Sequence, residues 1–151
     1  MEIGFYRCVR STPSEVLPQL AQKALDAGFR ISVKARDAEA VERLDEILWT
    51  FRADSFLPHA PADGNLLHDE IQPCLIADKF LITNAATLAI SMSAGLPPEN
   101  YGYERALLLF DGNDSEELAA ARQHWKALEG REGLTRTYWM QGERGWEEQK
   151  T

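Results

Sequence analysis

The side chains best suited to bind a metal ion are His59, His68 and Asp69. Imidazole nitrogens and carboxylate oxygens are common ligands, but metal sites recur at characteristic spacings. The spacing of these three residues matches no such pattern, and Cys8 and Cys74 lie far apart in the chain. We therefore predict no metal site, and we interpret the two cysteines as free, buried thiols.

Acid–base catalysis would require carboxylates held in a pocket. The chain has 24 Asp and Glu against 16 Lys and Arg. On the predicted helices these acids alternate with basic residues, as on a solvated face, so Asp45 and Glu46 are most simply surface charges. The sequence also lacks a P-loop and the GxSxG and HExxH motifs. We expect no catalytic site and no cofactor in this chain.

Trp49 has the side chain of a protein contact and lies in the segment RLDEILWTFRADSFLPH, residues 43–59. A helical projection gathers an apolar stripe of Val41, Leu44, Leu48 and Phe51. Trp49 falls about 140° from that stripe, on the acidic side of the helix. The loop that follows contains Phe56, Leu57, Pro58 and His59. An exposed Trp beside Phe and Pro is typical of an interface hot spot. The alternative is that Phe56 and Leu57 fold back over the helix and Trp49 lies flat on its own loop.

The elements that would position these side chains alternate between strands and helices. Strands are predicted over 2–9, 29–35, 105–110 and 134–141, with two short strand-like runs within 73–86. Helices are predicted to begin at Thr12, Asp37 and Asp114, and the first and last to end at Gly28 and Gly130. This order predicts a single α/β domain over residues 1–140, a Rossmann-like three-layer sandwich with a mostly parallel central sheet. Residues 141–151 read as a polar C-terminal tail.

Nucleotide binding is disfavoured by the turn after the first strand, RCVRSTPSE. This turn contains no glycine, so it is not a phosphate-binding glycine turn of the Rossmann type. A small Rossmann-like nucleotide- or small-molecule-binding enzyme remains the alternative function.

Composition limits the classes of partner. A chain of 151 residues with 44% hydrophobic residues can form one core of ordinary size. The net charge of −8 argues against gripping nucleic acid over a broad surface, although it leaves room for a small local basic patch. The N-terminus MEIGFYRCVR has no long apolar run, so we expect neither a signal peptide nor a membrane span, and a cytoplasmic location.

The segment RLDEILW…SFLPH closely resembles the signature of the chi subunit of bacterial DNA polymerase III, the accessory protein of the clamp loader. Weaker similarity covers most of the chain, including FYRC, LPQLAQKALDAGFRISV, PCLIAD…FLITNAA and ARQHWKAL. The resemblance implies a Rossmann-like adaptor without nucleotide binding. One face of such an adaptor holds the psi subunit, and another holds the acidic, Phe-ending C-terminal tail of single-stranded DNA-binding protein.

The resemblance also implies two sets of site residues. The psi-facing surface corresponds to Trp49, Phe56, Pro58 and His59, and the tail-binding positions correspond to Arg122, Trp125 and Lys126. The spacing i, i+3, i+4 places the second set on one helix face, where two cations can meet carboxylates beside an aromatic ring. The alternative is a core Trp125 with both cations paired to Glu117, Glu129 or Glu132.

Departures from the family leave several points open. His124 and Glu129 stand where the family often has basic residues, which predicts weaker binding of the tail. Trp139 and Trp146 have no assigned role. If the organism lacks psi, the Trp49 face would serve another clamp-loader subunit, a helicase or no partner. We expect a monomer within a hetero-complex that contacts DNA only indirectly.

Overall fold

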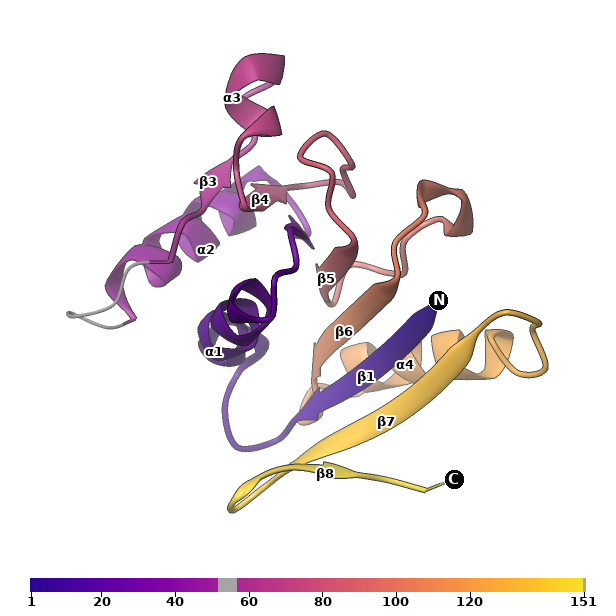
Figure 1. Ribbon diagram of the computed structural model, residues 1–151. Coiled ribbons are helices and arrows are strands. Elements are labelled where there is room, and N and C mark those ends of the chain that lie inside the picture. Colours follow the sequence, from indigo (N-terminus) through magenta and orange to yellow (C-terminus); the bar gives the residue numbers. More distant parts are fainter. Residues whose placement is uncertain (52–56, 151) are drawn as a thin grey trace.

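The computed structural model describes residues 1–51 and 57–150, which form an α/β fold with an eight-stranded sheet (Figure 1). The helices are α1 (Pro13–Asp26), α2 (Ala38–Thr50), α3 (Leu66–Glu70) and α4 (Ser115–Ala127), with a short 3₁₀ helix, η1 (Glu99–Tyr101). The strands are β1 (Glu2–Cys8), β2 (Ile31–Lys34), β3 (Ala60–Pro61), β4 (Cys74–Ala77), β5 (Leu88–Met92), β6 (Arg105–Asp111), β7 (Thr135–Gly142) and β8 (Gly145–Glu148).

The strands lie in the order β3-β4-β2-β5-β6-β1-β7-β8, and every neighbouring pair is parallel except β7–β8. Helices α1 and α2 cover one face of the sheet and α4 covers the other (Figure 1). The predicted three-layer α/β sandwich with a mostly parallel sheet is therefore confirmed. No helix in the described part of the chain is long and apolar enough to cross a membrane.

The core has two halves, one on each face of the sheet, because successive strand residues point in opposite directions. Ile3 and Phe5 of β1 pack in the half that contains α4, whereas Cys8 packs in the half that contains α1 and α2. On β6, Leu108 and Leu109 divide in the same way. A strand covered on both faces needs apolar side chains at successive positions, as the run RALLLF indicated.

Polar caps fix where the helices begin. Thr12 and Glu15 form the predicted capping box, with Pro13 as the first helical residue of α1. Asp37 accepts a hydrogen bond from the Ala40 N–H at 2.8 Å, and Asp114 caps α4. Each of the three main helices thus begins where the sequence predicted.

The prediction of a second strand-like run within 79–86 is wrong. This segment is a turn-containing loop, in which Ala85 has a φ of 58° that is incompatible with a strand. Buried Asn84 satisfies neighbouring carbonyls by donating to Ile31 O at 3.0 Å and Gln72 O at 2.9 Å. The strand follows instead as β5, a buried run that the sequence reading left unassigned.

Residues after position 140 contribute to the sheet. Strand β7 continues to Gly142, and a hairpin returns the chain as β8 along its outer edge. Trp146 of β8 packs edge-on against Tyr6 of β1, with ring centroids 5.1 Å apart. The segment predicted to be a polar tail therefore supplies the edge strand β8, and its Trp146 packs on the half of the core that contains α1 and α2.

The two cysteines are free and buried, as predicted. Burial raises the pKa of Cys8 to about 12, with nearby Asp111 and Glu117 adding to the shift. Burial alone raises the pKa of Cys74 to about 12. Both side chains are neutral thiols at physiological pH and pack as small apolar groups.

Candidate protein-interaction sites

Trp49 lies near the end of α2 and is 53% exposed. Leu44 and Leu48 of the same helix are buried, which confirms the predicted apolar stripe. Leu57 folds back into this core and is 1% exposed. The fold-back considered in the sequence thus occurs at Leu57, while Trp49 keeps half of its surface open to solvent. Phe56 lies outside the described residues.

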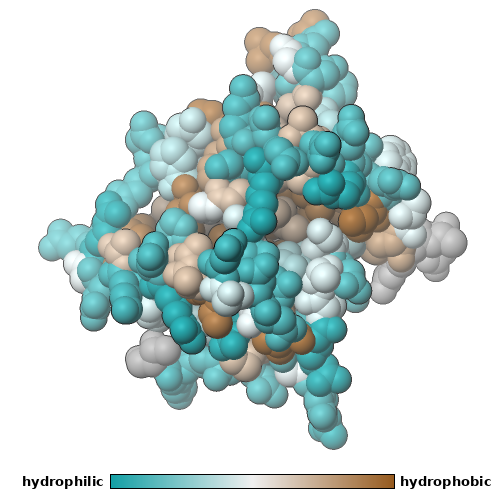
Figure 2. Space-filling model, turned by 180° about the vertical axis from the view of Figure 1, so that it is seen from behind, coloured by the Kyte–Doolittle hydropathy of each residue, from teal (hydrophilic) through white to brown (hydrophobic). Residues whose placement is uncertain are grey.

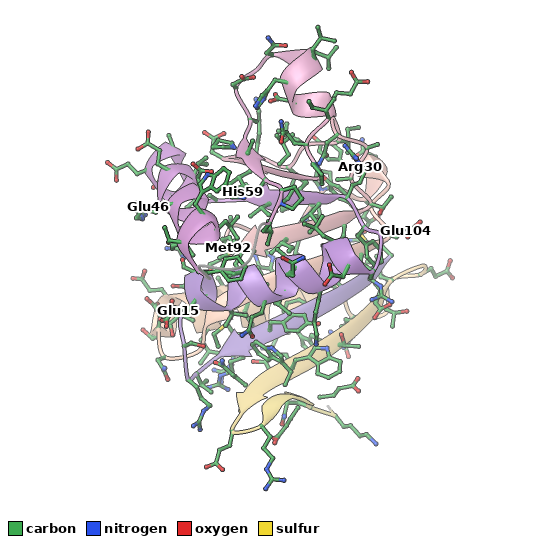
Figure 3. The ribbon with its side chains drawn as sticks, turned by 60° about the vertical axis from the view of Figure 1, so that its left-hand side comes forward. Glu15, Arg30, Glu46, His59, Met92 and Glu104 are labelled. Carbon is green, nitrogen blue, oxygen red and sulfur yellow. The ribbon has the colours of Figure 1, made fainter. Side chains whose placement is uncertain are left out.

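His59 holds the other side of the Trp49 ring. The two ring centroids are 4.7 Å apart at an interplanar angle of 57°. The His59 side chain is fully buried, with Nε2 3.0 Å from Asp45 Oδ1 and Nδ1 2.6 Å from the Leu57 carbonyl oxygen. Figure 3 shows His59 on the inner side of α2 and Glu46 on its outer side. His59 therefore packs against the buried side of the Trp49 ring, and its own side chain is not accessible to a partner.

The sequence-predicted set on this face is brought together only in part. Trp49 and His59 are in contact, and Pro58 is half-buried beside His59 in the chain. Asp45, which read as a simple surface charge, pairs with the buried imidazole. Asp45 and Trp49 are four residues apart on α2, so they share a face of the helix, and both contact His59.

Trp125 on α4 is half-buried and packs on the half of the core that lies between α4 and the sheet. Its ring meets Phe5 edge-on at 5.2 Å and Tyr138 edge-on at 5.7 Å between centroids. Arg122 and Lys126 on the same flank are exposed. Glu117, one of the acids proposed to neutralise them, pairs instead with Arg36 at 3.6 Å and accepts a hydrogen bond from the Asp111 N–H.

Arg136 is a site residue that the sequence reading missed. Its guanidinium lies 4.1 Å from the centroid of the Trp125 ring and donates a hydrogen bond to the Trp125 carbonyl. Arg136 comes from β7, so only the packing of β7 against α4 brings it here. Among the described residues, Arg122, Lys126 and Arg136 form no ion pair within 4.0 Å. The site therefore has one cation over the Trp125 ring, Arg136, and two exposed cations on α4.

A pocket of about 100 Å³ borders the opposite flank of α4. Leu108 and Phe110 lie among its lining residues, and Ala120 and His124 border it from the helix. On a helical projection these helix residues lie about 120° to 160° from Arg122 and Lys126. The pocket therefore lies on a different side of α4 from Arg122 and Lys126.

The face of the molecule seen from behind the view of Figure 1 is largely hydrophilic, with apolar side chains at the tip that carries α3 (Figure 2).

Asp63, His68 and Asp69 bring three possible ligand atoms within 4.8 Å of one another. Burial raises the pKa of Asp69, but hydrogen bonds from His68 and from the Asp63 and Gly64 N–H groups outweigh it and lower that pKa overall. The hydrogen bond to Asp69, at 2.8 Å, raises the pKa of His68. The cluster thus closes a loop before α3, and His59 is not part of it.

The crevice where nucleotides bind in doubly wound folds lies at the carboxyl ends of strands whose helices pass to opposite faces. Here β1 and β6 meet that description. Gln141 Oε1 accepts hydrogen bonds from the N–H groups of Val9, Arg10 and Ser11 at 3.2, 2.9 and 3.1 Å. Asn113 donates to the Val9 carbonyl at 3.1 Å. The side-chain amide of Gln141 therefore occupies three of the N–H groups that would face a phosphate.

Comparison with known proteins places the chain in a family. Residues 1–135 match the family model described as "DNA polymerase III chi subunit, HolC". The chain is also 33% identical over 64 residues to the DNA polymerase III subunit chi of Pseudomonas aeruginosa. That alignment covers 40% of this chain and 45% of the relative, so it spans less than half of the relative's length. Because the family match extends over most of the chain, this protein belongs to the DNA polymerase III chi subunit family.

Proposed function

We propose that this chain is a non-catalytic replication adaptor that links the clamp loader to the C-terminal tail of single-stranded DNA-binding protein. Membership of the chi subunit family supports a role in DNA replication. The observation that carries the adaptor proposal is Trp49, a half-exposed ring fixed from below by a fully buried His59 within the family-like motif. A large apolar ring held rigid at a surface loses little conformational entropy when a partner covers it.

The Trp49 face is proposed to hold psi or an equivalent clamp-loader subunit, with a helicase as another possible partner. Trp49 and Pro58 provide apolar surface, and His59 keeps the Trp49 ring in place. Phe56 belongs to the same proposed surface by its position in the motif. Acidic Glu46 lies on the outer side of the same helix, which would favour a partner with basic groups around its apolar contact (Figure 3).

The α4 flank is proposed to hold the tail of single-stranded DNA-binding protein. Arg122, Lys126 and Arg136 offer cations to the acidic side chains and the terminal carboxylate. The apolar rim of Trp125 offers a contact for the terminal Phe ring, although much of that ring is already committed to the core. This arrangement supports weak, salt-sensitive binding at micromolar strength, as expected of a small contact.

Affinity capture from native cell extract tests the adaptor proposal. The intact chain should retain both single-stranded DNA-binding protein and clamp-loader subunits. Trp49→Ala should lose only the clamp-loader subunits, and the double variant Arg122→Ala/Lys126→Ala should lose only single-stranded DNA-binding protein. Ile82→Ala serves as the matched control, since Ile82 is 52% exposed and lies on neither face. Recovery of neither class of protein by the intact chain would contradict the proposal.

A further inference from the structure

A groove of about 810 Å³ opens between α1 and the β7–β8 hairpin. Figure 3 looks onto this side of the molecule, with α1 above β1, β7 and β8. The family match ends at residue 135, so nearly all of the hairpin that walls the groove lies beyond it. None of the residues that line the groove is assigned to either proposed partner.

Aromatic rings line one side of the groove. Tyr6 and Trp139 are register partners on the parallel pair β1–β7, and their rings are nearly parallel, with centroids 6.1 Å apart and an interplanar angle of 9°. Trp146 from β8 meets Tyr6 edge-on at 5.1 Å. All three side chains are half-buried and border the groove, so part of each ring can contact a ligand.

The charge of the groove is opposite to that of the whole chain. Four cations line it, Arg10, Lys23, Arg105 and Arg144, against the single acid Glu143. The chain as a whole has 24 acidic and 16 basic residues. Arg105 lies 3.6 Å from Glu2. Within the described parts of the chain, the other three cations form no ion pair within 4.0 Å. A groove lined by one sign of charge attracts ligands of the other sign.

We propose that this groove binds a short stretch of single-stranded nucleic acid, with bases against Trp139 and Trp146 and phosphates on the surrounding cations. Aromatic rings accept any base by stacking, and cations along the groove follow the backbone. Three of the four cations are arginines, which bind phosphate through two parallel hydrogen bonds. Planar rings and forked donors together favour nucleic acid over an acidic peptide. This inference does not depend on the adaptor function, and it departs from the expectation that the chain contacts DNA only indirectly.

Fluorescence anisotropy of the full chain with a labelled oligothymidylate of about ten nucleotides tests the proposal. If three or four phosphates are neutralised, log K should fall with log salt at a slope of about −2 to −3, and affinity should drop roughly 20- to 50-fold between about 50 and 200 mM salt. Lys23→Glu and Arg144→Glu should each weaken binding at least several-fold. Trp146→Phe should weaken it less than Trp146→Ala, because a smaller ring still stacks.

Arg43→Glu is the matched control, because it changes the net charge equally at an exposed position of α2 that does not line the groove. It should leave binding nearly unchanged, and circular dichroism should show that all variants are folded. Equal weakening by Arg43→Glu would reduce the effect to net charge and overturn the site. Absence of oligonucleotide binding at low salt would also overturn the proposal. So would an acidic peptide that binds as tightly as the oligonucleotide and whose affinity is lowered by Arg144→Glu. None of these outcomes bears on the adaptor proposal, whose test uses the Trp49 and α4 variants.

Discussion

Lys126 and Arg122 project from α4 into solvent without an acidic partner within 4.0 Å among the described residues. Replacing either with Ala should therefore cost little stability while removing one charge-assisted contact to a bound acidic tail. We predict that Lys126→Ala weakens a tail peptide of single-stranded DNA-binding protein by about 1 to 2 kcal/mol, with Arg122→Ala similar. Calorimetric titration of the peptide would measure this, and a peptide without its terminal Phe is the control. Unchanged affinity in both variants would place the site elsewhere.

The Trp49→Ala variant tests whether Trp49 serves mainly in partner binding or in the stability of the fold. Because the ring is about half exposed but covers His59, we expect a stability loss of about 1 kcal/mol and a loss of partner binding of about 2 kcal/mol or more. His59→Ala should instead mainly destabilise the fold, because it leaves the buried Leu57 carbonyl and the partly buried Asp45 carbonyl without their imidazole partner. Urea denaturation and partner titration on both variants would test this. A Trp49 variant that unfolds without losing any partner would contradict the hot-spot interpretation.

His68 and Asp69 predict a pH effect of known sign. The hydrogen bond to Asp69 raises the pKa of His68, so its stabilising contribution is complete below the unfolded value of about 6.5 and is lost as pH rises through the higher folded value. NMR titration of the His68 ring should give a midpoint above 6.5, and Asp69→Asn should lower it. His124, which lies outside this cluster, provides the control resonance. A His68 midpoint unaffected by Asp69→Asn would show that this hydrogen bond does not form in solution.

At the scale of elements, local signals predicted most of the fold. Capping residues and apolar periodicity located α1, α2 and α4, because those features act within a few residues of each other. Strand β5 was missed and segment 79–86 was misassigned, because a buried apolar run looks alike in a strand and in a packed loop. The loop is fixed by Asn84, whose partners on Ile31 and Gln72 are far away in sequence.

In the candidate sites, too, features set by local sequence were predicted and features set by long-range packing were not. The exposure of Trp49 followed from helical geometry, and the shared face of Arg122 and Lys126 followed from their spacing. The burial of His59 and the position of Arg136 over Trp125 did not, because each depends on an approach between elements that no local pattern encodes. The hairpin after residue 140 was read as a tail because β8 is short and polar, and only its pairing with β7 orders it.

Gln141 ties the β7–β8 hairpin to the turn between β1 and α1. Its Oε1 accepts three backbone N–H groups, so Gln141→Ala would leave three donors to water or unpaired. We predict a loss of about 1 to 3 kcal/mol in the free energy of unfolding. Gln149→Ala is the matched control, since that amide makes one exposed hydrogen bond to the Glu147 carbonyl. Equal effects of the two substitutions in urea denaturation would contradict a special role for Gln141.

Across the whole molecule, charge is unevenly distributed in a way that composition cannot reveal. A chain of net charge −8 nevertheless has Arg136 over Trp125 and exposed cations on α4 on one side of the sheet, and a cation-lined groove between α1 and the hairpin on the other. Packing brings the cations of the groove together from separate elements, Lys23 from α1 and Arg105 from β6 among them. Local basic surfaces therefore coexist with an acidic exterior that limits nonspecific contact with nucleic acid.

Helix α2, which carries Trp49, and helix α4 cover opposite faces of the sheet (Figure 1). An eight-stranded sheet between them makes direct contact between the two partners unnecessary, and no element is shared by both faces. We predict that saturating the Trp49 face with its clamp-loader partner changes the affinity for the tail peptide by less than about twofold, a coupling free energy near zero. Peptide titration with and without the partner would measure this, and Trp49→Ala with the same partner is the control. Displacement of the peptide by the partner would mean that the two faces overlap, and a chain with overlapping faces could not hold clamp loader and single-stranded DNA-binding protein at the same time.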